Sequence, residues 1–289
     1  MTSVVCWLNN DEYFPGIWAV SDSRVSSNGG VMTDSLQKLF AIPLNLYGED
    51  DLILKQNPKK ILNVGFGFAG STLIGSSVKE ILTICLDNLS EIAYYDKAGT
   101  VDVSIDKRTP SIEEIALLTG RIAKNYLLSM GFCYPKSARC EMVIFGYCPK
   151  EKTNRIFLIK NSPARPEVIL VEEQAVGEDT YVILGDKKNE VYEMISKKNE
   201  ICKLTPFDQG RGPIVALQQI IKDEAVTTIG GHVQICITTS SMARIMYVSI
   251  LSEFKFSPFL GFDFSDIGTL GGFTINVSPG MSINEKLLD

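Results

Sequence analysis

Histidine is almost absent from this chain, because His232 is the only one among 289 residues. A single histidine excludes a multi-histidine metal site. It also leaves His232 as the only base available to a Ser-His-Asp or Cys-His mechanism. His232 opens an apolar segment, and a structural role is the better interpretation there. Catalytic groups must therefore be sought among other residue types.

Long apolar runs and paired cysteines are also missing. No apolar run approaches the ~18–20 residues that span a bilayer, and the first residues lack the basic and apolar regions of a signal peptide. The seven cysteines form no C-x-x-C pair, so neither a disulfide framework nor a zinc site is predicted. We expect a cytoplasmic protein that needs no metal and no cofactor.

The net charge of −6 argues against nucleic acid or an anionic membrane as a partner. An apolar fraction of 45% is enough for a sizeable core. We predict one large domain over residues 1–253, followed by a C-terminal extension over 254–289 to which no structure is assigned. Residues 43–60 are polar, contain two prolines and are predicted to form a surface insertion.

Strand-like and helix-like segments come in alternating groups along the chain. The helices are predicted at 74–89, from a capping box at Ser111 to Met130, near 187–199 and at 214–224. The strands are predicted at 3–9, 17–20, 38–42, 61–70, 140–148, 155–160, 167–171, 181–185, 232–239 and 246–251. This order favours an α+β protein with two packed, mainly antiparallel sheets and a helical layer outside each.

The chain begins Met1-Thr2, directly before the first predicted strand. Removal of Met1 would leave Thr2 with a hydroxyl and a free α-amine on one residue. An α-amine has a pKa near ~7.7–8.0, and its neutral form can take the proton of the hydroxyl and activate it as a nucleophile. A threonine after Met is common, however, so this feature has weight only in combination with others.

Three further motifs have the order and context that such a nucleophile requires. Val20-Ser21-Asp22-Ser23-Arg24 closes the first hairpin, Lys38 precedes a short strand, and Gly67-Phe68-Ala69-Gly70-Ser71-Thr72 lies between a strand and a helix. Together with Thr2, these motifs resemble the proteasome β-subunit family and its simpler bacterial relatives. Those proteins are N-terminal-nucleophile hydrolases with a four-layer αββα fold.

The resemblance implies a threonine-type peptidase or amide hydrolase in which Thr2, Asp22 and Lys38 are catalytic. It assigns the oxyanion hole to Gly70. Phe68, Ser71 and Thr72 are implied to bind substrate, with Ser23 and Asp186 in supporting positions. The implied partners are a peptide or protein substrate and further copies of the chain in a ring, and the resemblance also allows a regulatory ATPase.

The same residues have a physical rationale that does not depend on the family. A cation such as Lys38 lowers the pKa of a nearby amine, because like charges disfavour each other, and Asp22 would hold that cation in place. A glycine-rich strand end can offer a backbone N–H to an oxyanion. Taken singly, Asp22 could be a turn carboxylate, Lys38 an edge-strand charge, and Gly67 and Gly70 packing glycines.

The second half of the chain departs from the family pattern. Val226 and Ile229 stand where polar supporting residues are usual, and Asp186 stands in place of a serine. These departures favour a rival interpretation, in which the chain is a non-catalytic assembly or binding module. An amidase that acts on non-peptide substrates is a third interpretation.

Overall fold

The computed structural model describes residues 3–27, 30–48, 57–90, 95–96, 99–100, 108–134, 138–224, 226–250, 260, 262, 269–275, 280–283 and 285–288. Met1 and Thr2 therefore lie outside the described residues, as do residues 49–56 of the predicted insertion and most of the extension that begins at residue 254.

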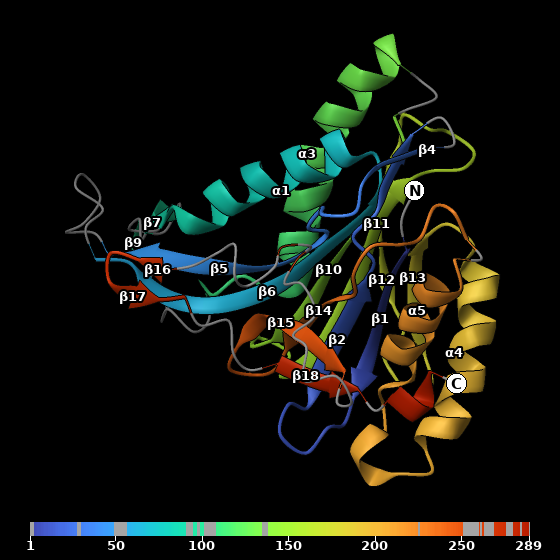
Figure 1. The fold of residues 1–289 in the computed structure, drawn as a ribbon. Coiled ribbons are helices and arrows are strands. Elements are labelled where there is room, and N and C mark those ends of the chain that lie inside the picture. Colours follow the sequence, from blue (N-terminus) through green and yellow to red (C-terminus); the bar gives the residue numbers. More distant parts are fainter. Residues whose placement is uncertain are drawn as a thin grey trace.

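Two six-stranded sheets lie against each other in the centre of the molecule (Figure 1). The first sheet has the order β13-β1-β2-β14-β15-β18, and its neighbouring strands are antiparallel except for the parallel pair β15 and β18. In that order the strands are Tyr181–Gly185, Ser3–Asn9, Gly16–Ser21, Gln234–Thr238, Ala243–Ile250 and Gly280–Ile283.

The second sheet has the order β12-β11-β10-β6-β5-β7, with β5 and β7 as its parallel pair. In that order the strands are Ile169–Gln174, Thr153–Asn161, Cys140–Cys148, Lys59–Gly70, Leu39–Tyr47 and Leu89–Ser90. Three small ribbons pair β3 (Val25–Ser27) with β4 (Gly30–Thr33), β8 (Tyr95–Asp96) with β9 (Gly99–Thr100), and β16 (Thr269–Leu270) with β17 (Phe273–Thr274).

Helices cover the outer face of each sheet. α1 (Thr72–Asp87) and α3 (Ile112–Cys133) pack on the second sheet, while α4 (Lys188–Cys202) and α5 (Gly212–Asp223) pack on the first. The predicted capping box begins α3: Glu114 N–H donates to Ser111 Oγ at 3.1 Å, and Ser111 N–H donates to Glu114 Oε2 at 2.7 Å. The box satisfies backbone donors that the first turn leaves unpaired.

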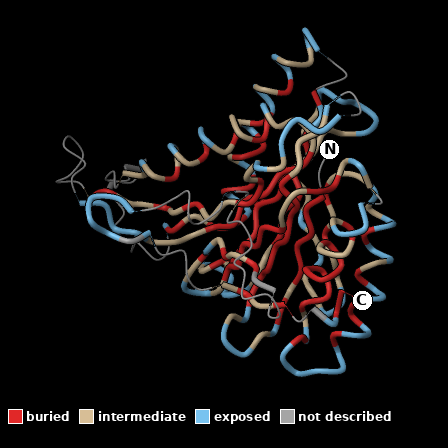
Figure 2. The backbone as a smooth tube through the Cα atoms, viewed as in Figure 1, coloured by how far each residue is buried: buried red, intermediate tan, exposed pale blue. Residues whose placement is uncertain are grey.

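Strand β1 shows why a strand in the centre of the fold has a continuous apolar sequence. Val4 and Cys6 face the second sheet, whereas Val5 and Trp7 face the helices α4 and α5. Because successive side chains of a strand point to opposite faces, a strand that is covered on both sides needs apolar residues at every position. Figure 2 shows the resulting band of buried residues through the middle of the molecule.

Three apolar clusters separate the four layers. One lies between α4, α5 and the first sheet and contains Trp7 and Trp18, whose ring centroids are 6.1 Å apart. Another lies between α1, α3 and the second sheet, and the third lies between the two sheets. The predicted α+β fold, a four-layer αββα sandwich of two mainly antiparallel sheets, is confirmed.

The region predicted as a surface insertion belongs partly to the second sheet. β5 continues to Tyr47 and β6 starts at Lys59, so the two strands form a long hairpin. Leu44 is fully buried and Tyr47 is 8% exposed, although polar residues and Pro43 surround them in the sequence. The polar residues indicated a loop, but alternating apolar side chains are sufficient for a strand that is covered on one face.

The end of the predicted C-terminal extension is also part of the fold. β18 adds a parallel strand to β15, and a short 3-10 helix, Glu285–Leu287, follows it. Leu287 and Leu288 are buried in the cluster beneath α4 and α5, and Lys198 Nζ donates to Leu287 O at 2.6 Å. The last described residues therefore complete the first sheet and its core.

Candidate functional site

The residues predicted to be catalytic come from segment ends that meet at one end of the sandwich. Ser3 begins β1 and pairs with Gly185, the last residue of β13. Asp22 directly follows β2, and Lys38 directly precedes β5. Gly70 ends β6, the strand that pairs with β5. Long-range pairing in two sheets thus brings Asp22 and Lys38 together.

The carboxylate of Asp22 is fully buried and accepts four hydrogen bonds. Its Oδ1 accepts from Ser3 N–H at 3.0 Å and from Lys38 Nζ at 3.0 Å. Its Oδ2 accepts from the backbone N–H groups of Arg24 and Gly230, each at 3.1 Å. A buried carboxylate is tolerated when it is paired and hydrogen-bonded in this way.

Lys38 is fully buried beside Asp22, and its backbone is held on both sides. Its N–H donates to Gln234 Oε1 at 2.9 Å, and its carbonyl accepts from Phe68 N–H at 3.3 Å. Its Nζ donates to Asp22 and, at 2.6 Å, to the carbonyl of Arg24. An ammonium group has three donors, so one proton of Nζ has no acceptor among the described residues.

Burial shifts the proton affinity of both members of the pair. It raises the pKa of Asp22, while the Lys38 charge and the N–H groups of Ser3 and Gly230 act against this rise. Burial also lowers the pKa of Lys38, and Asp22 acts against that fall. Both directions follow from the cost of a charge in a poorly solvated site. The Lys38 ammonium therefore loses a proton more readily than a surface lysine does.

A loop around Gly231 locks the segment that carries Asp22. Ser23 Oγ donates to the carbonyl of Asp34 and accepts from His232 N–H at 2.7 Å. Gly231 has φ +76°, and a Cβ there would lie 2.3 Å from Ser23 Oγ, so only glycine fits without movement. The hydroxyl of Ser23, predicted as a supporting group, is engaged in this loop.

Gly70 and the residues after it form the turn from β6 into α1. Gly70 has φ +102°, and a Cβ there would lie 2.6 Å from the carbonyl of Arg139. Ser71 Oγ accepts from Ile74 N–H at 3.4 Å and caps α1, while Thr72 is the first residue of the helix. Phe68 is 1% exposed and stacks with Phe40 in the core beneath α1. Ser71 and Phe68 thus have structural contacts, and their predicted substrate contacts stay predictions.

Asp186 follows Gly185, whose strand partner is Ser3, and is half-buried. Beside it, Glu141 of β10 accepts from Gly185 N–H at 2.7 Å and from Lys188 Nζ at 2.8 Å. Glu141 therefore joins the two sheets at this end of the sandwich.

Glu141, Gln234 and the backbone N–H groups that donate to Asp22 were not predicted from the sequence. A polar residue inside an apolar strand, as at Gln234, is the one signal that could have indicated such a contact. Thr2 itself lies outside the described residues.

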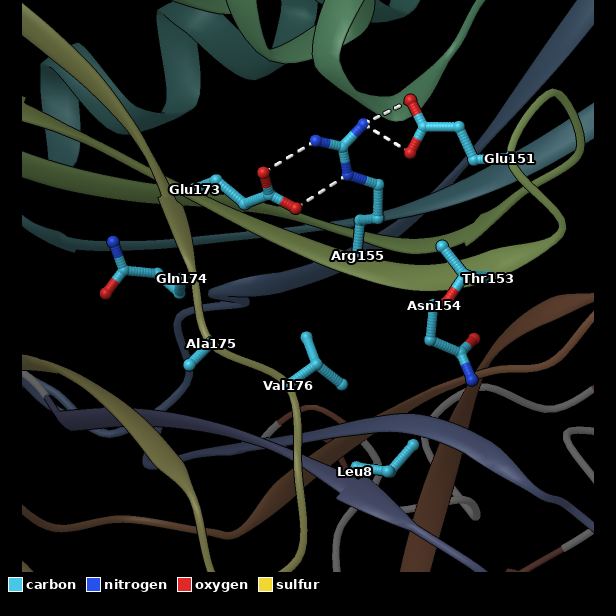
Figure 3. Close-up of a pocket in the computed structure, with 9 residues that line it drawn as sticks. All are labelled: Leu8, Glu151, Thr153, Asn154, Arg155, Glu173, Gln174, Ala175 and Val176. Atoms are coloured by element: carbon cyan, nitrogen blue, oxygen red, sulfur yellow. Dashed lines mark hydrogen bonds and ion pairs between the residues drawn. The ribbon is translucent and has the colours of Figure 1, made fainter.

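Two large hollows lie at the other end of the sandwich. The one in Figure 3 has a volume of about 580 Å³ and includes Leu8 of the first sheet and Arg155 of the second. Arg155 donates to Glu173 at 2.7 and 2.6 Å and to Glu151 at 2.6 Å, so its charge is already paired. The other hollow, of about 680 Å³, lies beside the connection from α4 to α5. Neither contains Asp22 or Lys38.

The layers and strand order define the fold of the N-terminal-nucleophile hydrolases. The structure is similar to Anbu, an ancestral β-subunit, from Yersinia bercovieri, with a TM-score of 0.50 and 16% identity over 85% of this chain and 87% of that one. A Gly-1 mutant of Anbu from Hyphomicrobium sp. strain MC1 aligns with a TM-score of 0.49 and 11% identity over 84% of this chain and 83% of that one. At these identities the likeness concerns the fold.

The predicted resemblance to the proteasome β-subunit family is not supported by sequence comparison, and this prediction is corrected to a similarity of fold. No protein-family model matches the chain, and no curated protein sequence matches it. The similarity that is found is to the solved structure of Anbu, an ancestral β-subunit, and it is a similarity of structure. The motifs around Asp22, Lys38 and Gly70 are each only a few residues long, and matches of this length do not establish a sequence family. No helix in the described parts of the chain is long and apolar enough to cross a membrane.

Proposed function

We propose that the chain is a threonine-type amide hydrolase in which Thr2 becomes the nucleophile after removal of Met1. The observation that carries this proposal is the buried pair of Asp22 and Lys38. The backbone N–H of Ser3 and the Nζ of Lys38 donate to the same oxygen of Asp22. The backbone nitrogen of Ser3 is joined to Thr2 by a peptide bond. The remaining proton of Nζ is available to a group on Thr2.

The chemistry follows from these groups. The positive charge of Lys38 lowers the pKa of the free α-amine, so that more of it is neutral at pH 7. The amine takes the hydroxyl proton of Thr2 as the oxygen attacks an amide carbonyl. The amide C–N bond then breaks, the leaving amine takes that proton, and an ester remains on Thr2. Water attacks this ester, which releases the acid and restores the hydroxyl.

The other predicted residues have roles around this step. The N–H of Gly70 is proposed as the oxyanion donor. Thr72, Phe68 and Ser71 are proposed as the residues that contact the substrate. Ser23 supports the site by holding the segment that carries Asp22. Asp186, which follows the strand partner of Ser3, is proposed as a second supporting residue.

The test begins with the mature N-terminus, measured by intact mass. The protein is then incubated with a β-lactone electrophile, and the adduct is located by peptide mapping. We expect loss of Met1 and one adduct on Thr2, which Thr2→Ala abolishes. Thr33→Ala, at an exposed threonine, is the matched control and should label normally. Retention of Met1, or labelling that does not depend on Thr2, would contradict the proposal.

A non-catalytic assembly or binding module is the second candidate. The observation that favours it is Ile229, which is fully buried in the apolar cluster beneath α5 and offers no polar group to the site. A protein that loses Met1 but forms no adduct on Thr2 would support this candidate. If an adduct forms, hydrolysis of peptide amides compared with small non-peptide amides identifies the substrate class.

We also propose that copies of the chain associate into a ring, as the sequence resemblance implied. Support comes from exposed apolar side chains on the outer helices: Leu73 and Ile84 of α1 and Phe132 of α3, which are 66%, 57% and 92% exposed. Such side chains favour burial against a partner. Native mass spectrometry should show a homo-oligomer, and a monomer at micromolar concentrations would contradict it. A regulatory ATPase and a cytoplasmic location stay predictions.

A further inference from the structure

The hollow of about 680 Å³ is far from the Asp22–Lys38 pair and is independent of the proposed function. β1 begins beside that pair at Ser3 and reaches the hollow at Trp7 to Asn9. At ~3.3 Å per residue the length of the strand is about 20 Å. The turn from β1 to β2 and the connection from α4 to α5, both at the lower end of Figure 1, supply the other walls.

The walls of this hollow are held in place by hydrogen bonds. The carbonyl of Gly210 accepts from Trp7 Nε1 at 3.0 Å and from Asn9 Nδ2 at 3.2 Å. Asn199 Nδ2 donates to the hydroxyl of Tyr181, which donates to Asp179 Oδ1 at 3.3 Å. The connection between the helices is therefore fastened to the strand end, and the cavity is preformed, as is usual for ligand sites.

The guanidinium of Arg211 is the unusual feature of this hollow. The residue is 8% exposed, it packs 4.0 Å above the ring of Phe207, and it donates one hydrogen bond, of 2.8 Å, to the carbonyl of Ser282. No carboxylate of the described residues lies within 4.0 Å of it, and its Nε is buried without a partner among them. The more distant charges of Asp11 and Asp208 offset only part of the fall in the Arg211 pKa that burial causes. A buried charge without a counterion is costly unless a ligand supplies one.

The first turn of α5 adds to the attraction for an anion. This twelve-residue helix starts at Gly212, directly after Arg211, and Arg211 makes no side-chain capping bond. The N-terminus of a helix carries a partial positive charge. A carboxylate placed against Arg211 would meet both charges.

Acidic residues on the other walls limit which anion fits. Asp11, Glu12 and Glu178 also line the hollow, in addition to Asp179, which Lys203 approaches to 3.6 Å. A dianion such as phosphate would be repelled by these groups. A ligand with an ammonium group beside its carboxylate satisfies both signs of charge. The rings of Trp7 and Phe207 offer apolar contact to the rest of the ligand.

We propose that this hollow binds a free α-amino acid with an aromatic side chain, with its carboxylate on Arg211 and its ammonium towards Asp11, Glu12 and Glu178. A volume of about 680 Å³ is in the range of sites for small ligands, roughly 300–1,000 Å³. Charge complementarity gives the selectivity, because a ligand that lacks either charged group leaves one set of wall charges without a partner.

The experiment is calorimetric titration of the full chain with L-phenylalanine, with phenethylamine, which lacks the carboxylate, and with 3-phenylpropionate, which lacks the ammonium. We expect L-phenylalanine to bind about tenfold or more tightly than either analogue. Arg211→Gln should weaken the binding of L-phenylalanine by about tenfold or more and leave the affinity for phenethylamine unchanged. Arg155→Gln, at the paired arginine of the other hollow, is the matched control and should bind normally.

Three results would overturn the proposal: no heat with L-phenylalanine at millimolar concentration, equal affinity for all three compounds, or tighter binding of inorganic phosphate. The thermal unfolding midpoint of each variant verifies its fold. If Arg211→Gln does not fold, Phe207→Ala replaces it, because this side chain is 55% exposed and its loss should leave the core intact. Undiminished binding by a folded Arg211→Gln, or by Phe207→Ala where it is used instead, would also count against the site.

Discussion

Each end of the sandwich contains a buried cation beside a candidate site, and the surroundings of these two cations differ. Lys38 is fully buried and has Asp22 at 3.0 Å, whereas Arg211 is 8% exposed and has no carboxylate of the described residues within 4.0 Å. The first charge is compensated within the chain. The second is offset only at longer range, by Asp11 and Asp208 among the described residues, and it leaves room for a bound anion. The role of a buried charge therefore depends on whether a group of opposite charge lies close to it, and not on burial alone.

The largest expected effect comes from breaking the compensated pair. Lys38→Met leaves the carboxylate of Asp22 buried without its cation, and removal of one partner of a buried pair costs about 3–5 kcal/mol. Urea unfolding at pH 7 measures the change. Lys188→Met is the control, because its side chain is 41% exposed and its contact with Glu141 should contribute about 1 kcal/mol or less. Equal losses in both variants would show that the pair is not the special feature of that end.

Substitution of two glycines that have the same φ angle tests which end of the sandwich is more rigid. Gly231, beside the pair, and Gly210, beside the hollow, both have φ +76°. A Cβ on Gly231 would meet Ser23 Oγ at 2.3 Å and the backbone oxygen of Asp34 at 2.8 Å, whereas on Gly210 it would meet only side-chain atoms of Asn9, the nearest at 2.5 Å. We expect Gly231→Ala to cost about 3 kcal/mol and Gly210→Ala about 1–2 kcal/mol.

Thermal unfolding of the two glycine variants is the measurement. The difference between them is expected because a side chain can rotate away and a backbone carbonyl cannot. A larger loss for Gly210→Ala would show that the connection between α4 and α5 is the more rigid region.

Removal of the uncompensated cation should have little effect on the free protein. Arg211→Met breaks no close ion pair among the described residues. The hydrogen bond to Ser282 and the longer-range attraction to Asp11 and Asp208 that it loses are offset by the removal of a buried charge. We expect the free energy of unfolding to change by about 1 kcal/mol or less in urea at pH 7. A loss as large as that for Lys38→Met would mean that Arg211 has a counterion in the folded chain.

The smallest effect is expected at the exposed margin of the site. The hydrogen bond from Arg24 lowers the pKa of Asp34 below its ordinary value of 3.8. A carboxyl with a lowered folded pKa stabilises the fold above pH 3.8, and this stabilisation is lost as the pH falls through the folded pKa. The side chain of Asp34 is 38% exposed, so solvent screening limits the contribution to about 0.5 kcal/mol.

The measurement for Asp34 is urea unfolding of the wild type and Asp34→Asn at several pH values. The two proteins should differ at pH 7 and converge below the folded pKa of Asp34. A difference that is the same at low pH would assign the effect of the substitution to packing.

Much of the fold could be predicted from the sequence, because its signals are local. Apolar runs at 3–9 and 140–148 match β1 and β10, and the capping box at Ser111 begins α3 where expected. Local signals failed where tertiary contacts decide. Because of the polar residues near Pro43, the continuation of β5 to Tyr47 was not predicted. The described end of the extension forms a strand because it pairs with the edge of β15.

The candidate site divides in the same way. The sequence by itself determined the residue types, namely the threonine after Met1, the carboxylate of Asp22, the lysine at 38 and the glycine at 70, and the order in which they occur. Only the tertiary structure decided that Asp22 and Lys38 form a fully buried pair with Ser3 N–H on the same oxygen. It also decided that Arg211 has no carboxylate within 4.0 Å among the residues that the structure describes. The physical reason is that pairing and burial depend on strands far apart in the chain, whose register no local pattern records.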